Sequence, residues 1–77
     1  MDDLYKSRYI HCLPELDPDT DCWVPKARVL WDIRGTQEHQ LLTGPNDRFK
    51  IIDHAEIYAV EMAKAWIDAE LVDNLSP

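Results

Sequence analysis

The sequence predicts an α+β domain in which a three-stranded antiparallel β-meander packs against one C-terminal α-helix (β-β-β-α). Residues 23–33 alternate apolar and polar side chains with a period of two, the pattern of a strand with one buried face. Residues 54–71 contain neither Gly nor Pro and include five alanines, which favours a helix. The 77 residues suffice for one small domain, with frayed ends expected at about 1–5 and 73–77.

The first strand is predicted at residues 6–13, which are rich in strand formers and contain neither Gly nor Pro. Tyr9 and His11 share one face of this strand, and Ile10 and Cys12 share the other. Residues 14–21 hold two prolines and three aspartates, a composition typical of turns. We therefore expect a wide loop between the first and second strands.

The second strand, at residues 23–33, has a clearly apolar face. That face comprises Trp23, Pro25, Ala27, Val29, Trp31 and Ile33. Pro25 has no amide hydrogen, so the start of the strand is expected to be unpaired on one side. Arg34 and Gly35 form the predicted turn to a third strand at residues 36–43, and residues 44–47 end that strand.

The helix has a predicted start signal at Asp53. Asp53 is a good N-cap, Glu56 completes a capping box, and Ile52 with Ile57 fits a hydrophobic staple. At 100° per residue one broad stripe faces the sheet. Its members are Ala55, Tyr58, Ala59, Met62, Ala63, Trp66 and Ala69. Trp31 and Trp66 are expected to meet between sheet and helix.

A second apolar group on the helix lies outside this stripe and consists of Ile57, Val60, Ile67 and Leu71. The N-terminal segment, the loop through residues 49–51 or another chain covers it. The second sheet face, with Val24, Leu30 and Ile10, also lacks a covering layer. Short chains often complete their burial by association, so a homodimer and a thinly covered monomer both remain open. The predicted interaction surface comprises Trp23, Val24, Leu30, Ile57, Val60 and Ile67.

The net charge of −7 disfavours nucleic acid, whose binding depends on Lys and Arg. We expect a protein partner or self-association, with an acidic loop of Asp17, Asp19 and Asp21 steering any basic partner. The alternative is a nucleic-acid-associated module that uses the strand residues Lys26 and Arg28 together with Arg34. The sequence has neither an apolar signal region nor a membrane span, so we expect a cytoplasmic protein with no membrane partner.

Chemistry-bearing motifs are sparse. The three aspartates resemble the opening of a calcium loop, but its sixth and twelfth positions hold Cys22 and Arg28 where Gly and Glu are needed. His11 and Cys12 are adjacent, so a strand points them to opposite faces, which disfavours zinc. Cys12 with His39 lacks a recognisable catalytic motif. We expect no catalytic residue, metal or cofactor, and reduced thiols at Cys12 and Cys22, whose pairing stays open.

The order strand–strand–strand–helix over residues 8–71, most sharply at Ile52-Asp53-His54-Ala55-Glu56, resembles the HicB-type antitoxin domain. That family carries a Pro-Asp-Leu-Pro-Gly-like turn after its second strand, where this chain has Arg34-Gly35. The layout is also similar to small uncharacterised bacterial proteins with one meander and one helix. It resembles the double-stranded-RNA-binding domain as well, but lacks that domain's first helix and the basic start of its last one. The resemblances transfer no functional residues.

Overall fold

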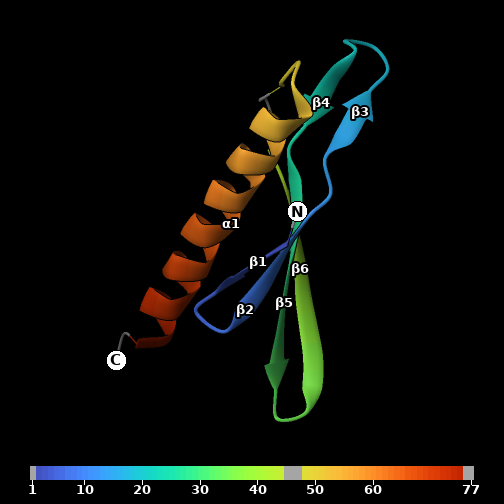
Figure 1. The fold of residues 1–77 in the computed structure, drawn as a ribbon. Coiled ribbons are helices and arrows are strands. Elements are labelled where there is room, and N and C mark those ends of the chain that lie inside the picture. Colours follow the sequence, from blue (N-terminus) through green and yellow to red (C-terminus); the bar gives the residue numbers. More distant parts are fainter. Residues whose placement is uncertain (1, 45–47, 76–77) are drawn as a thin grey trace.

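The computed structural model describes residues 2–44 and 48–75, where six strands precede one helix (Figure 1). The elements are β1 (Asp2–Tyr5), β2 (Arg8–Cys12), β3 (Glu15–Asp17), β4 (Cys22–Val24), β5 (Lys26–Ile33), β6 (Thr36–Thr43) and α1 (Ile52–Leu75). A four-stranded antiparallel sheet has the order β1-β2-β5-β6, and β3 and β4 form a second, two-stranded sheet. The α+β class with one C-terminal helix is confirmed. The three-stranded meander is wrong in its number of strands.

β1 occupies residues that the sequence predicted to be a frayed end. It pairs with β2 through the two-residue loop Lys6–Ser7, whose φ angles are 50° and 67°. Two positive φ angles are the pattern of a type I′ turn, whose twist matches that of paired strands. Such turns usually contain Asn-Gly or another glycine, and this one contains neither. The hairpin therefore has no sequence signal of the ordinary kind.

Pro25 divides the predicted strand at residues 23–33 into β4 and β5. Its carbonyl accepts a hydrogen bond from the amide of Gly44 (N···O 3.0 Å). β4 pairs with β3, so the predicted loop at residues 14–21 contains a short strand before its turn. Between β5 and β6, Arg34 and Gly35 form the predicted turn, with φ angles of 51° and 84°.

The core lies between α1 and one face of the larger sheet (Figure 1). Its buried side chains in the described residues are Ile10, Cys12, Ala27, Val29, Ala55, Ala59, Val60, Ala63 and Ile67. The helix alanines recur every four residues, which puts a smooth stripe against the strands. The rings of Trp31 and Trp66 meet beside this core, as predicted, with their centroids 5.6 Å apart. Ile10 was predicted to lie on the uncovered face, but it lies in the core. The prediction failed because strand alternation separates the two faces of a strand without showing which of them the helix covers.

α1 begins at Ile52, before the predicted start. The carbonyl of Ile51 accepts hydrogen bonds from the amides of His54 (3.1 Å) and Ala55 (3.4 Å). Ile51 therefore holds the capping position, and Asp53 lies inside the first turn, so the prediction of Asp53 as the N-cap is wrong. A carboxylate in the first turn still interacts favourably with the helix dipole.

The core face of α1 is rotated away from the predicted stripe. Val60 is 8% exposed and Ile67 is 0% exposed, whereas Ala69 is exposed. Placing Val60 and Ile67 on an open surface is therefore wrong. Of the second apolar group, Val60 and Ile67 belong to the core, and Leu71 packs against it together with Tyr5 of the β1–β2 hairpin. Ile57 is the exception, with 56% of its surface exposed.

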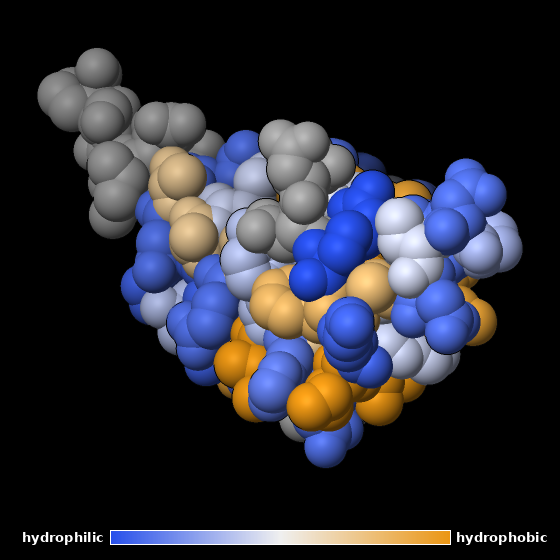
Figure 2. Space-filling model, turned by 90° about the horizontal axis from the view of Figure 1, so that it is seen from above, coloured by the Kyte–Doolittle hydropathy of each residue, from blue (hydrophilic) through white to orange (hydrophobic). Residues whose placement is uncertain are grey.

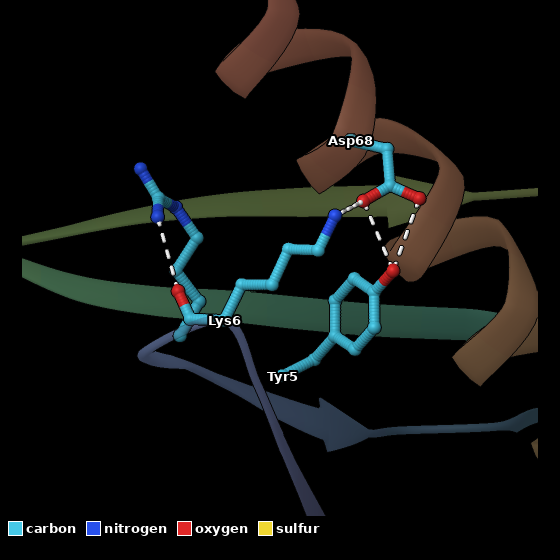
Figure 3. A network of polar contacts seen from close by, with 4 residues as sticks. Tyr5, Lys6 and Asp68 are labelled. Carbon is cyan, nitrogen blue, oxygen red and sulfur yellow. Dashed lines mark hydrogen bonds and ion pairs between the residues drawn. The ribbon is translucent and has the colours of Figure 1, made fainter.

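Polar contacts anchor the β1–β2 hairpin to α1 (Figure 3). The Tyr5 hydroxyl donates to the carboxylate of Asp68, whose oxygens lie 3.0 and 3.1 Å away, and Lys6 Nζ lies 2.6 Å from the same group. A longer ion pair joins Lys64 and Asp3 at 3.7 Å. The Lys6 ammonium and the Tyr5 hydroxyl hold the pKa of Asp68 below its ordinary value. Asp68 in turn raises the pKa of Lys6.

Candidate interaction surface

The candidate site is the face of the larger sheet that points away from α1. Register and strand alternation place on this open face Leu4, Tyr9, His11, Lys26, Arg28, Leu30, Asp32, Gln37, His39, Leu41 and Thr43. One row crosses all four strands and consists of Leu4, Tyr9, Leu30 and His39. Each strand thus contributes a side chain to one continuous surface.

Large apolar side chains are exposed on the open face. Tyr9 is 61% exposed, Leu4 59% and Leu41 49%, and Leu30 between them is half-buried. A hollow of about 230 Å³ opens among Tyr9, Ile10, His11, Leu30 and Gln37. Apolar side chains that gather on one face, beside polar groups and a hollow, are typical of a surface that receives a partner.

The six residues predicted as an interaction surface do not form one surface. Leu30 lies on the open face. Trp23 and Val24 are half-buried in β4, where the backbone of Trp23 pairs with that of Phe49 (Phe49 N to Trp23 O, 3.0 Å). Ile57 is exposed on α1, across the sheet from Leu30. Val60 and Ile67 lie in the core, as described above.

A second set of exposed apolar groups lies near the start of α1 and the β3–β4 hairpin. It comprises Leu16, Ile51, Ile52 and Ile57, with exposures of 45%, 52%, 37% and 56%. Figure 2 views this end of the molecule from above and shows hydrophobic groups interspersed with hydrophilic ones. Hydrophilic groups separate these side chains, whereas the apolar side chains of the open face lie on neighbouring strands of one sheet, so the open face is the stronger candidate.

The acidic loop is tied down by local contacts. Asp17 Oδ1 accepts a hydrogen bond from the amide of Asp19 (3.0 Å), and Asp17 Oδ2 lies 3.5 Å from Arg48 Nε. The Asp19 amide holds the pKa of Asp17 below its ordinary value, with help from Thr20 and Arg48. Asp21 has a positive φ of 57°, and its amide binds the Asp17 carbonyl at 2.8 Å. Asp17 is thus a structural residue of the turn.

The basic residues proposed for nucleic acid have different surroundings. Lys26 Nζ lies 2.6 Å from Glu15 of β3, which neutralises it. Arg28 is exposed on the open face, two residues along β5 from Leu30. Arg34 is exposed in the turn at the far end of β5. By strand alternation Lys26 and Arg28 both lie on the open face, and of these two Lys26 is the one already paired with a carboxylate.

Both cysteines are free thiols. Cys12 is buried, with its Sγ 3.8 Å from the Glu56 carbonyl, and Cys22 is half-buried. Within residues 2–44 and 48–75, no three His, Cys, Asp or Glu side chains are grouped so that they could hold a metal ion. In the same part of the chain, no helix combines the length and hydropathy needed to cross a membrane.

Sequence reasoning did not select Leu4, Tyr9 and Leu41 for the surface. The alternation of residues 6–13 does separate Tyr9 from Ile10, so a signal for Tyr9 existed. Leu4 had none, because β1 itself was not predicted. Leu41 lies within the predicted third strand, but its direction follows from the register with β5, where it lies opposite Arg28.

Comparison with known proteins gives no match to a family model, to a curated protein or to a solved structure. The likeness to HicB-type domains and a bacterial origin stay predictions. A functional assignment must therefore be argued from the geometry of the chain itself.

Proposed function

We propose that this chain is a non-catalytic protein-interaction domain that binds its partner through the open face. The observation that supports this most is the uncovered sheet face with exposed Leu4, Tyr9 and Leu41. We further propose that it works in the cytoplasm, where the free thiols of Cys12 and Cys22 stay reduced.

Burial of the apolar side chains would supply the affinity. Full burial of one large apolar side chain contributes about 1.5–3 kcal/mol. Leu4, Tyr9 and Leu41 are already about half-buried, so covering them adds roughly half of that amount each. The hollow beside Tyr9 and the polar groups around it would have to supply the rest of the energy that offsets the entropic cost of association. Polar contacts around these groups would come from His11, Gln37 and His39. Such contacts fix the orientation of a bound partner and favour one partner over others.

The nucleic-acid alternative has less support. The chain has a net charge of −7, and Lys26 is already paired with Glu15. Arg28 and Arg34 alone would neutralise few phosphates. If this alternative were right, DNA or RNA would bind at low salt and dissociate steeply as salt is added, and Arg28→Ala with Arg34→Ala would flatten that dependence.

Affinity capture from cells of the source organism tests the proposal with three forms of the full chain. The double variant Leu4→Ser/Tyr9→Ser alters the open face on β1 and β2. The matched control Ile57→Ser removes an apolar side chain of similar exposure on α1. We expect one partner protein to be retained by the wild type and by Ile57→Ser but lost with the double variant. Equal capture by all three forms would exclude the open face as the binding surface.

A further inference from the structure

The outer edge of β6 has backbone groups without a partner strand in the described part of the chain. The Gly44 amide bonds the Pro25 carbonyl, and the Leu13 amide bonds the Lys26 carbonyl (2.9 Å). In antiparallel strands such bonds alternate residue by residue, so both observations fix the same pattern. Even-numbered residues of β6 bond toward β5. The odd-numbered ones direct their amide and carbonyl groups outward, and they are Gln37, His39, Leu41 and Thr43.

One of these outward backbone groups already accepts a hydrogen bond from a side chain. Gln40 Nε2 donates to the carbonyl of Leu41 at 3.2 Å. A side-chain amide bound to an outward strand carbonyl stands where the amide of a neighbouring strand would bind. The contact therefore supports the outward direction assigned to Leu41 and shows that this position accepts a hydrogen bond.

β6 also lacks the devices that usually protect a sheet edge. Such edges are blocked by prolines, by several charges or by being very short. β6 is eight residues long, contains no proline and has one formal charge, at Glu38. The opposite edge, β1, is four residues long and begins with Asp2-Asp3. Of the two edges of the larger sheet, β6 is the unprotected one.

We propose that β6 pairs antiparallel with β6 of a second copy of this chain, about a two-fold axis at Gln40. This register pairs all four outward residues, with Leu41 opposite His39 and Thr43 opposite Gln37. Gln40 then faces Gln40 of the second copy, and Glu38 faces Leu42. The interface uses the backbone edge of β6, whereas the partner surface proposed above uses the side chains of the open face, although Gln37, His39, Leu41 and Thr43 belong to both.

Charge favours a second copy at this edge over other places on the molecule. Two chains of −7 repel each other, so they meet most easily where carboxylates are few. In the proposed register the two Glu38 side chains are four residues apart along the strands, or roughly 13 Å at about 3.3 Å per residue. That exceeds the screening length of about 8 Å at physiological salt. Added salt should therefore strengthen the dimer by screening the remaining repulsion.

Sedimentation of the full chain over a range of concentrations gives the first test. We expect a monomer–dimer equilibrium that shifts toward dimer with salt. Leu41→Pro, which removes an outward amide without touching the ladder to β5, should abolish the dimer. Leu41→Thr, which keeps the amide, should retain it. A wild-type chain that stays monomeric at millimolar concentration overturns the proposal, as does loss of the dimer in both variants to the same extent.

Cross-linking tests the register without a proline. In a Cys12→Ser/Cys22→Ser background, Gln40→Cys should form an intermolecular disulfide, because opposed residues of a non-hydrogen-bonded pair have Cα atoms about 4.5 Å apart, within disulfide range. Glu38→Cys is the control, since its two copies would be roughly 13 Å apart. A dimer in which Glu38→Cys cross-links as fast as Gln40→Cys contradicts this interface.

Discussion

Ile57 and Ile67 lie on the same helix, and the sequence pattern assigns them to the same apolar group, yet the structure gives them opposite environments. Ile67 is 0% exposed and is among the largest fully buried side chains, whereas Ile57 is 56% exposed. Identical substitutions at the two positions change helix propensity by the same amount. The difference between their effects on the free energy of unfolding therefore measures burial alone.

The magnitude follows from the atoms removed. Ile→Val deletes one buried methylene at position 67, which costs about 0.5–1.5 kcal/mol. Ile→Ala deletes three carbons, about 2.4 kcal/mol at about 0.8 kcal/mol each. The cavity left behind raises that cost into the range of about 2–5 kcal/mol. At Ile57 both changes should stay within about 0.5 kcal/mol of the wild type.

Urea unfolding followed by the circular dichroism of α1 is the suitable assay. A core of this size supplies only about 3–5 kcal/mol, so Ile67→Ala is expected to be marginally folded. Ile57→Val and Ile67→Val should both stay folded, so their free energies of unfolding can be compared at the same dependence on urea concentration. Equal losses at positions 57 and 67 would refute the assignment of Ile67 to the core and restore the open helix surface that the sequence pattern predicted.

Three further outcomes are expected. Asp68 has a lowered pKa, so its contribution to stability is present at neutral pH and is lost as the pH falls through that pKa; urea midpoints at pH 7 and pH 3 should therefore differ more in the wild type than in Asp68→Asn. Gly44→Ala would place a Cβ 2.7 Å from Pro25 Cγ, and should lower the free energy of unfolding by about 1–3 kcal/mol in the same urea assay. Reaction of the native protein with a thiol reagent should show one fast group, Cys22, and one slow group, Cys12; two equally fast thiols in the folded protein would contradict the burial of Cys12.

Part of the fold could be predicted because local patterns decide it. The alternation around Val29 and the Arg34-Gly35 turn are visible in the sequence, and so is the alanine spacing of the helix. The β1–β2 hairpin was not visible, since Lys6 and Ser7 adopt positive φ angles without glycine. Tyr5 of that hairpin packs against the core that contains Val60 and Ile67, and its contact with Asp68 ties the hairpin to the helix, so leaving the hairpin out removed part of the cover of the helix.

The candidate site was predictable only in part, for a related reason. Strand alternation separates two faces but does not say which of them a helix covers. Ile10 was therefore assigned to the wrong side, and Tyr9 was left out of the surface. Trp23 was included in the predicted interaction surface as part of one long strand. Pro25 interrupts that strand, so Trp23 lies in β4, which pairs with β3 and not with the larger sheet.

An apolar open face is nevertheless built into the sequence. Three neighbouring strands each contain two consecutive apolar residues, namely Tyr9-Ile10, Val29-Leu30 and Leu41-Leu42. A strand must point the members of such a pair to opposite faces, so no choice of helix position can bury both. The helix packs against Ile10, Val29 and Leu42, which leaves Tyr9, Leu30 and Leu41 on the other side. A sheet that is apolar on both faces normally has a layer on each, and the described chain supplies one layer. The lack of a second layer in the described part of the chain is the physical reason to expect a partner on the open face.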